Sequence, residues 1–382
     1  MKIFYWAPWI GKVGSVKSVM NSAYILEKYS KNHIKTRIID AVGEWKEFKD
    51  HLRYINLSNF KFFNLLPKTG FLKSRISYIL IFLYSFFPLL NLLKKEKPDY
   101  LVVHLITSLP LLLKIIFNFD TKIILRISGY PKMNFLRKLI WKKASKKIYK
   151  VTFPTSDLLN QFKEFNIFDQ EQMSILRDPI ISFKNLPKLK NEKRLSEMTN
   201  IKNYFISVGR FTKQKNFEFL VKNFIELKKQ YVDIKLVILG DGELMNRVKK
   251  IIINEKLEQD ILTPGYQKNV FNYFSEARAL ILPSLWEDPG FVIVEAAACN
   301  LNIISSDCKN GPKEILLNGR AGYLFKNNDS NSFKKVFELF INSNQSELYE
   351  KKIIAKKQAK KFTFFSHYKS FKNIIKYFIF FI

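Results

Sequence analysis

The sequence predicts an α/β protein of two tandem domains, each built on a doubly wound parallel sheet. Short apolar runs typical of buried strands alternate with helical patterns, and this alternation lapses once, in a polar stretch around residue 190. The length of 382 residues is enough for two domains of ordinary size. Glycines and polar residues follow several of the strands, at the edge where open α/β sheets bind ligands.

Composition limits the class of protein and of partner. With 47% hydrophobic residues the chain is expected to fold, and its net charge of +31 suggests an anionic partner: nucleic acid, anionic lipid or a phosphorylated ligand. The cysteines, Cys299 and Cys308, show no metal-ligand spacing and predict no structural disulfide, which fits a reducing cytosol. The N-terminus lacks the pattern of a signal peptide, so we expect a cytoplasmic protein.

The first domain begins with a strand, a glycine loop and a helix. The strand is Lys2–Pro8, the loop carries Gly11 and Gly14, and the helical pattern runs over Val16–Tyr29. Glycines here let the backbone approach a substrate closely, although a tight turn without ligand contact is the alternative. The further strands expected in this domain are Thr36–Asp40, Tyr100–Ile106, Lys122–Ile127 and Lys150–Phe153.

Residues 55–93 form an apolar segment whose relation to a membrane is open. Its run Ile76–Leu93 holds no charged side chain and just reaches about 18 residues, the length at which a transmembrane helix becomes a candidate. Pro88, the strand that follows at once and the lysines at 94, 95 and 97 favour a helix lying in the membrane interface. A buried core helix and a spanning helix remain the alternatives.

The helical pattern over Phe135–Tyr149 places its basic residues on one broad face. These residues are Arg137, Lys138, Lys142, Lys143, Lys146 and Lys147. Such a charge run is usually a solvated face. Beside the apolar segment it favours a peripheral surface for the anionic inner face of a membrane.

The alternation lapses in Ser182–Asn203, which is polar, charged and without clear periodicity. We therefore expect a first domain at residues 1–185, a linker at 186–203 and a second domain at 204–363. The aromatic last segment, residues 364–382, is expected to pack as a helix on the first domain or to touch the membrane. The strands expected in the second domain are Tyr204–Val208, Ile234–Leu239, Asp260–Pro264, Ala279–Leu282 and Leu301–Ser305.

Three strand ends of the second domain carry candidate ligand-binding loops. Gly209 and Arg210 follow the first strand, with Lys215 shortly after. Glycine permits a sharp turn there, and two cations suit the charge of a leaving diphosphate. Residues 240–242 (Gly-Asp-Gly) and 264–266 (Pro-Gly-Tyr) follow the next two strands. A solvated loop is the alternative in a chain with 64 lysines and arginines.

The stretch Pro283–Asn300 joins a buried strand to a helix through a polar loop that turns at Gly290. Because a helix begins at that turn, its first backbone N–H groups are left unpaired and point into a crevice. Glu287 and Glu295 flank the helix start with seven residues between them. Since Glu295 lies about one turn into the helix, both carboxylates are placed to face one ligand.

In this order and spacing, the motifs resemble the retaining GT-B glycosyltransferases of family four, the glycosyl transferases group 1. The segments that carry the resemblance are GRFTKQKN, VILGDGEL, PGYQKNV and PSLWEDPGFVIVEAAACNLNIISSDCKNGPKEIL, within residues 200–326. The first domain is more loosely similar, through APWIGKVGS, KPDYLVVH and the strand before Gly129. The resemblance implies two Rossmann-like domains with the donor site in the cleft between them.

The resemblance also implies roles for single residues. Arg210 and Lys215 match the basic pair that holds the donor's diphosphate. Glu287 matches the acidic residue associated with the transferred sugar, and Glu295 matches the one bound to the donor ribose. The other residues expected to bind the donor are Gly11, Gly14, Gly209, Gly265, Tyr266, Gly290, Phe291 and Val292.

The chain departs from the family pattern beside the expected reaction centre. Ser128-Gly129 stands where the family often has His-Gly, which leaves His104, Arg126 and Ser128 as candidates near the reacting sugar. A packed core residue is the alternative for His104. Asp288-Pro289 replaces the commoner Gly-Phe after the first acidic residue.

The expected reaction is transfer of a hexose-type sugar, with retention, from a UDP- or GDP-linked donor to a glycan acceptor. Since no Asp-x-Asp occurs, we expect neither a metal nor a cofactor, and side-chain cations to take the diphosphate charge. The basic, apolar surface suggests a lipid-linked acceptor of O-antigen, lipopolysaccharide or capsule-like synthesis. It also suggests peripheral association with the inner face of the membrane, and no nucleic-acid partner.

Two other functions stay open. A nucleic-acid-binding protein would account for the charge, but the sequence has no recognisable reading motif, and its basic residues lie beside apolar segments. A GT-B-type sugar-nucleotide epimerase would keep the fold and change the chemistry. The spacing of Glu287 and Glu295 and the loop after Gly209 favour the transferase.

Overall fold

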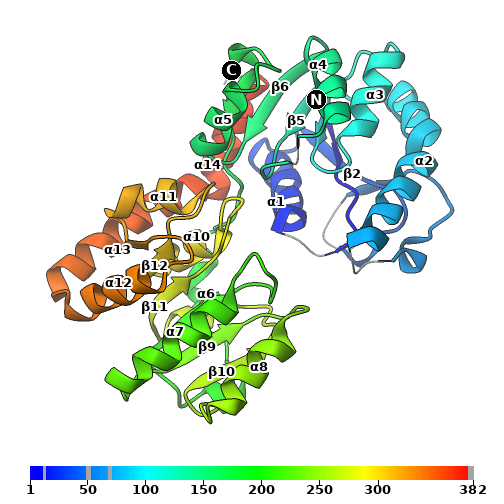
Figure 1. The fold of residues 1–382 in the computed structure, drawn as a ribbon. Helices are drawn as coiled ribbons and strands as arrows, with labels where there is room; N and C mark the ends of the chain where they lie inside the picture. Colours follow the sequence, from blue (N-terminus) through cyan, green and yellow to red (C-terminus); the bar gives the residue numbers. More distant parts are fainter. Residues whose placement is uncertain (12–13, 49–52, 68–70, 132, 377–382) are drawn as a thin grey trace. The chain divides into compact units, whose positions relative to one another are not determined.

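The computed structural model describes residues 1–11, 14–48, 53–67, 71–131 and 133–376, and Figure 1 shows their fold. The chain forms two compact units. One comprises Met1–Pro179 with the segment from Phe364 onward, and the other is Ile180–Thr363. Each unit contains one parallel sheet with helices packed on its faces, so the predicted doubly wound α/β class is confirmed.

Within the described residues, the first unit holds a seven-stranded sheet in the order β3-β2-β1-β4-β5-β6-β7. The strand order reverses between β1 and β4, and ligands bind beyond the carboxyl ends at such a switch point. The strands are β1 (Lys2–Trp6), β2 (Lys35–Asp40), β3 (Tyr54–Asn56), β4 (Tyr100–Val103), β5 (Lys122–Arg126), β6 (Ile148–Phe153) and β7 (Met173–Ile175). The helices are α1 (Gly14–Tyr29), α2 (Phe71–Glu96), α3 (Ser108–Ile116), α4 (Phe135–Ser145), α5 (Ser156–Lys163) and α14 (Phe364–Ile374).

The second unit holds a six-stranded sheet in the order β10-β9-β8-β11-β12-β13, which reverses between β8 and β11. The strands are β8 (Tyr204–Val208), β9 (Leu236–Leu239), β10 (Ile261–Gly265), β11 (Ala277–Leu282), β12 (Asn302–Ser306) and β13 (Tyr323–Phe325). The helices are α6 (Leu186–Lys190), α7 (Phe217–Gln230), α8 (Met245–Asn254), α9 (Phe271–Phe274), α10 (Phe291–Ala298), α11 (Pro312–Ile315), α12 (Ser330–Asn342) and α13 (Gln345–Ala359).

The central strands are apolar on both faces because helices cover both sides of each sheet. In β1, Phe4 and Trp6 enter one hydrophobic core cluster, whereas Ile3 and Tyr5 enter the other. Parallel sheets buried on both faces read as continuous apolar runs. This is why periodicity and length found the central strands, with shifts of a few residues at their ends.

Three strands were not predicted from the sequence. β3, β7 and β13 have three residues each, and each is the outermost strand at its edge of a sheet. Short edge strands carry too few apolar residues to form a periodic signal.

The segment predicted as a linker, residues 186–203, lies inside the second unit. Leu186 and Met198 are buried in a core cluster that also contains Ile180 and Ile181. The chain leaves the first unit at Pro179 instead. Two buried side chains in a polar stretch produce no periodic pattern, so this packing could not be predicted from the sequence.

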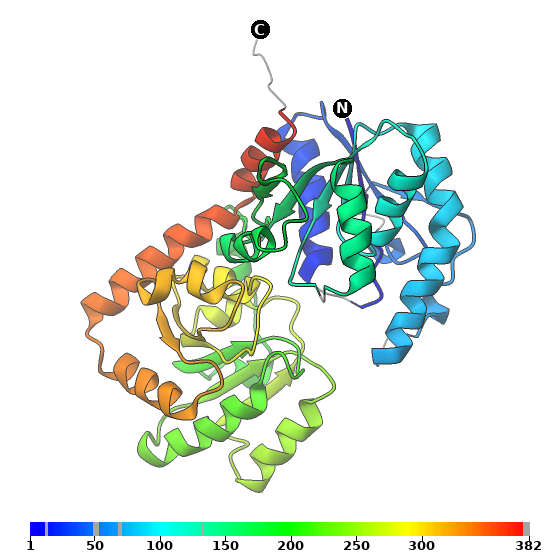
Figure 2. The same cartoon turned by 45° about the horizontal axis from the view of Figure 1, so that its top comes forward.

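The C-terminal segment returns to the first unit through α14, which lies beside α1 (Figures 1 and 2). His367 of α14 pairs through Nε2 with Ser22 Oγ at 2.8 Å and through Nδ1 with the Arg177 carbonyl at 2.7 Å. Phe371 is buried in the same core cluster as Leu26 of α1. The predicted helix extends to 382, and its part beyond residue 376 lies outside the described residues.

Helix α2 is apolar on both sides. Ile81, Leu89, Leu90 and Leu93 are buried in the core of the first unit. On the other side the exposed apolar residues are Ile76, Tyr78, Ile79, Leu80, Leu83 and Phe87. Among the described helices, α2 is the one whose stretch Arg75–Glu96 is long and apolar enough to cross a membrane, although length and composition alone are weak evidence. A contiguous apolar surface of this kind marks an interaction site.

Candidate functional site

In the second unit, the loops after β8, β9 and β11 meet at the carboxyl edge of the sheet, because these strands are neighbours. The contact between the first two loops requires glycine. Gly240 has a φ of +142°, and a Cβ on it would overlap the carbonyl oxygen of Gly209. The amide of Phe211 donates to the carbonyl of Asp241 at 2.9 Å, which ties the two loops together. The glycines singled out from the sequence therefore permit close backbone packing at this edge.

Lys215 reaches across this edge to Glu287. Its aliphatic stem lies against Gly209, 3.0 Å from where a Cβ would stand, and its Nζ lies 2.5 Å from Glu287 Oε1. The Ser284 hydroxyl donates to the same oxygen at 2.6 Å. The pair is largely buried, with 16% of the Lys215 side chain and 4% of the Glu287 side chain exposed. The structure thus brings two predicted residues together and adds Ser284, which no sequence signal marked.

The loop that carries Glu287 is fixed on both sides. The Leu285 amide donates to the Gln214 carbonyl at 2.8 Å, and Gln214 Nε2 donates to the Trp286 carbonyl at 3.0 Å. On the other side, the Glu287 amide donates to the Lys309 carbonyl at 3.2 Å. A carboxylate held by this many contacts is placed before any ligand arrives.

Helix α10 begins at Gly290, whose φ of +87° lies in the left-handed region. No side chain caps this helix start, and the Gly290 carbonyl accepts from the Ile293 amide at 3.0 Å. The amides of Phe291 and Val292 precede the first intrahelical donor, so they point beyond the helix end toward the Glu287 loop. Glu295 lies one turn into α10 and is partly buried.

Arg210 and Tyr266 are exposed at the same edge of the sheet. Within the described part of the chain, no ion pair engages Arg210. Tyr266 is 72% exposed and follows Gly265, which has a φ of +82° and open space where a Cβ would stand. A free guanidinium and a free aromatic ring suit a phosphate and a nucleobase, respectively.

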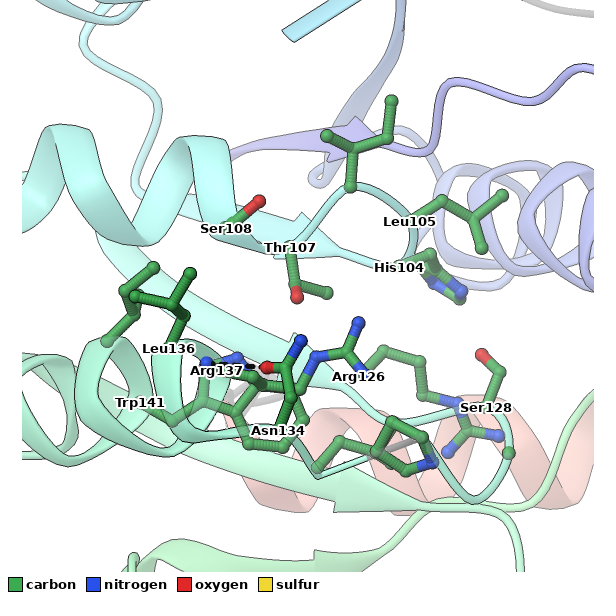
Figure 3. Close-up of a pocket in the computed structure, with 15 residues that line it drawn as sticks. His104, Leu105, Thr107, Ser108, Arg126, Ser128, Asn134, Leu136, Arg137 and Trp141 are labelled. Carbon is green, nitrogen blue, oxygen red and sulfur yellow. Dashed lines mark hydrogen bonds between the residues drawn. The ribbon is translucent and has the colours of Figure 1, made fainter. Parts of the chain in front are cut away.

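In the first unit, His104, Arg126 and Ser128 line one cavity of about 410 Å³ (Figure 3). His104 follows β4, and its amide donates to the Trp6 carbonyl at 2.9 Å. Burial, and then the charge of Arg126, lowers the pKa of His104 well below its usual value, so the ring is neutral at pH 7. The predicted Gly11 and Gly14 follow β1 at the same edge of this sheet, and the two residues between them lie outside the described residues.

Arg126 has a structural role. It is 2% exposed, and its guanidinium donates to Asp178 Oδ2 at 2.6 Å and to the Leu176 carbonyl at 2.5 Å. Asp178 also accepts from the Ser18 hydroxyl. A guanidinium bound this fully to protein acceptors is unavailable to a ligand. Of the three candidates in this unit, His104 and Ser128 keep free hydrogen-bonding atoms.

Two doubly wound parallel units, the second with cations and a helix start at its carboxyl edge, have the architecture of a GT-B glycosyltransferase. A solved glycosyltransferase of Rickettsia africae has the same fold, with a TM-score of 0.76, 16% identity and coverage of 99% of both chains. Residues 190–362 match the model described as glycosyl transferases group 1. This match falls within the second unit, Ile180–Thr363.

Two curated relatives agree with this assignment. An uncharacterized glycosyltransferase of Methanocaldococcus jannaschii is 30% identical over 253 residues, which are 60% of this chain and 61% of the relative. The Campylobacter jejuni relative is N-acetylgalactosamine-N,N'-diacetylbacillosaminyl-diphospho-undecaprenol 4-alpha-N-acetylgalactosaminyltransferase. It is 26% identical over 250 residues, 64% of this chain and 67% of the relative. The chain thus spans about three fifths to two thirds of these relatives.

Proposed function

We propose that this protein is a retaining glycosyltransferase that moves a sugar from a UDP- or GDP-linked donor to a lipid-linked glycan. The observation that supports this best is the buried pair of Lys215 and Glu287 beside the uncapped start of α10. It lies in a domain that matches the glycosyl transferases group 1 model. Cationic side chains and unpaired backbone amides at one edge of the sheet suit a nucleoside diphosphate.

Arg210 and the start of α10 are the main groups that bind the negatively charged diphosphate of the donor. Lys215 is partly neutralised by Glu287, whereas Arg210 has its five N–H donors available. The amides of Phe291 and Val292 add the positive end of the helix dipole. These groups stabilise the departing diphosphate, and no metal or cofactor is required in this proposal.

The remaining contacts orient the sugar and the nucleoside. With Oε1 taken by Lys215 and Ser284, Glu287 offers Oε2 to a sugar hydroxyl. Glu295 binds the ribose, and Tyr266 stacks on the base. The acceptor oxygen attacks the anomeric carbon on the face that the diphosphate leaves, and its proton passes to the departing diphosphate oxygen. Attack on this face retains the anomeric configuration.

The acceptor is a lipid-linked glycan in polysaccharide synthesis. The Campylobacter relative is named for a diphospho-undecaprenol acceptor. The exposed apolar side of α2 suits a membrane that carries such a lipid, and Leu83 and Phe87 there are each 65% exposed. Because the opposite side of α2 is buried in the protein core, the helix lies on the membrane and does not span it. The basic residues of α4 meet the anionic head groups of the inner face.

A panel of UDP- and GDP-sugars, tested for protection against thermal unfolding, identifies the donor. Arg210→Ala is expected to leave the melting temperature of the ligand-free protein unchanged. It should reduce the rate of transfer by about 100-fold, because it removes a positive charge that stabilises the transition state. Lys213→Ala, an exposed lysine in the same loop, is the matched control. Equal transfer rates in both variants would disprove the proposed donor site. If no nucleotide sugar protects the protein against thermal unfolding, the proposed glycosyltransferase activity is wrong.

Membrane association has its own test. Leu83→Glu is expected to weaken sedimentation with anionic vesicles about tenfold or more, since it places a charge where the exposed leucine would contact the apolar part of the membrane. Leu339→Glu, on α12 of the second unit and 56% exposed in the parent, is the control. High salt or carbonate should release the protein from membranes, and retention after both treatments would instead favour a spanning α2.

A further inference from the structure

The cavity of the first unit carries a chemistry that the donor site does not explain. It lies beyond the carboxyl ends of β4 and β5, and its volume of about 410 Å³ falls in the range of small-molecule sites, about 300–1,000 Å³. The loop after β4, with His104 and Thr107, faces the loop after β5, with Ser128 and Asn134, across it (Figure 3). None of its described lining residues is acidic, while Arg126 and Arg137 are basic.

Two buried side-chain atoms of the cavity wall have no hydrogen-bond partner among the described residues. They are His104 Nδ1 and Ser128 Oγ, both screened from solvent. The His104 residue is 8% exposed. Buried polar groups without a partner are rare in folded proteins, because each costs the free energy of its lost hydrogen bonds to water. A ligand that hydrogen-bonds to both atoms removes that cost.

Two helices also begin at the cavity. Ser108 opens α3 without a side-chain cap, and Asn134 caps α4 by accepting from the Arg137 amide at 2.9 Å. The Phe135 and Leu136 amides of α4 have no intrahelical acceptor. In α3 this holds for the Ser108 amide, because the Leu109 amide donates to the Ile106 carbonyl at 3.2 Å and Pro110 has no N–H. These amides give the cavity a positive potential. The guanidinium of Arg137 lies 5.9 Å from the centre of the Trp141 ring, at the cavity wall. Together these features favour an anion.

The cavity is continuous with an apolar surface. Leu136 lines the cavity and is nevertheless 66% exposed, and its neighbours on α4, Phe135 and Leu139, are exposed as well. An anion alone gains nothing from such a rim. An amphiphile does, because its charged head enters the cavity while its apolar chain covers these side chains.

We propose that this cavity binds the diphosphate of a prenyl-diphosphate-linked acceptor, with the first prenyl units on Phe135, Leu136 and Leu139. Arg137 and the starts of α3 and α4 hold the diphosphate charge, and the Ser128 hydroxyl donates to a phosphate oxygen. Neutral His104 donates one further hydrogen bond. Arg126 shapes the floor through its bonds to Asp178 and Leu176 and does not touch the lipid. The identity of the ligand as the acceptor rests on the proposed function.

Titration calorimetry with farnesyl diphosphate, inorganic pyrophosphate and farnesol tests the site. We expect farnesyl diphosphate to bind most tightly. Arg137→Gln should weaken it by about tenfold or more, since a hydrogen bond to a charged group is lost, and Ser128→Ala by a smaller factor. Leu136→Ser should weaken farnesyl diphosphate and leave pyrophosphate unchanged. Lys163→Gln, an exposed charge at the end of α5, is the control.

The outcomes separate this site from the donor site. Unchanged farnesyl diphosphate affinity in Arg137→Gln and Ser128→Ala, or competition by UDP, would overturn the proposal. If UDP raises the melting temperature while farnesyl diphosphate does not bind, the acceptor site is wrong and the proposed function stands. If farnesyl diphosphate does not bind and no UDP- or GDP-sugar of the panel binds either, both proposals fail. Pyrophosphate bound as tightly as farnesyl diphosphate would overturn the lipid assignment.

Discussion

Replacing Lys215 by methionine tests the central pair of the proposed donor site. Methionine keeps the stem that packs on Gly209 but removes the ammonium group that lies 2.5 Å from Glu287 Oε1. Only 4% of the Glu287 side chain is exposed, so water compensates poorly for the lost partner. Ser284 would then be the remaining side-chain donor to this carboxylate oxygen in the described structure.

The expected cost follows from this burial. Removing one member of a buried ion pair destabilises a protein by about 3–5 kcal/mol, because it leaves an uncompensated charge. For a unit of this size, about 2–4 °C of melting temperature correspond to each kcal/mol. Lys215→Met should therefore lower the melting temperature of the second unit by about 6–20 °C.

A double-mutant cycle by urea denaturation separates the pair from other effects. Glu287→Gln removes the charge on the other side, and the double variant, which leaves no unpaired charge, should be more stable than Lys215→Met alone. A loss below about 1 kcal/mol in Lys215→Met, as for an exposed pair, would refute the argument. So would a double variant whose loss equals the sum of the two single losses.

Two further perturbations test the packing of each unit. Gly240→Ala should destabilise the second unit by about 2–5 kcal/mol, since its Cβ meets the Gly209 carbonyl, whereas Gly319→Ala, with open space at a φ of +97°, should cost about 1–2 kcal/mol by urea denaturation. Burial lowers the pKa of His367 to about 4, so the neutral ring stabilises the fold above pH 6.5 and about 3 kcal/mol is lost as the pH falls from 6.5 toward 4. His367→Gln should flatten that dependence, exposed His33→Gln should keep it, and the same slope in both variants would contradict the assignment.

The sequence predicted the sheet edges well because their signals are local. A strand that ends at a glycine, such as the one before Gly209, requires only neighbouring residues to be recognised, and parallel strands bring such ends to one edge. The loops after β8, β9 and β11 therefore met as expected. The predicted linker was wrong because prediction from sequence depends on local signals. Leu186 and Met198 are buried in the core, but the residues around them form no local pattern.

Side-chain pairs between residues far apart in the sequence could not be predicted. Lys215 and Glu287 are 72 positions apart, and nothing in either motif indicates that one neutralises the other. Arg126 and Asp178, 52 positions apart, form another buried pair. This pairing gives a structural role to an arginine that the sequence marked as a candidate near the reacting sugar. Ser284 and the helix starts around His104 also acquire their meaning only from the packing of neighbouring loops.

The buried pair changes which cation matters most for the donor. If Lys215 and Arg210 were equivalent phosphate ligands, alanine at either position would impair transfer and leave stability alone. Because Lys215 already neutralises Glu287, its loss should lower stability, donor affinity and the placement of the sugar together. Arg210 is exposed and outside any ion pair in the described residues, so its loss should act on the diphosphate alone. The ratio of the stability effect to the activity effect therefore distinguishes a positioning cation from a binding one.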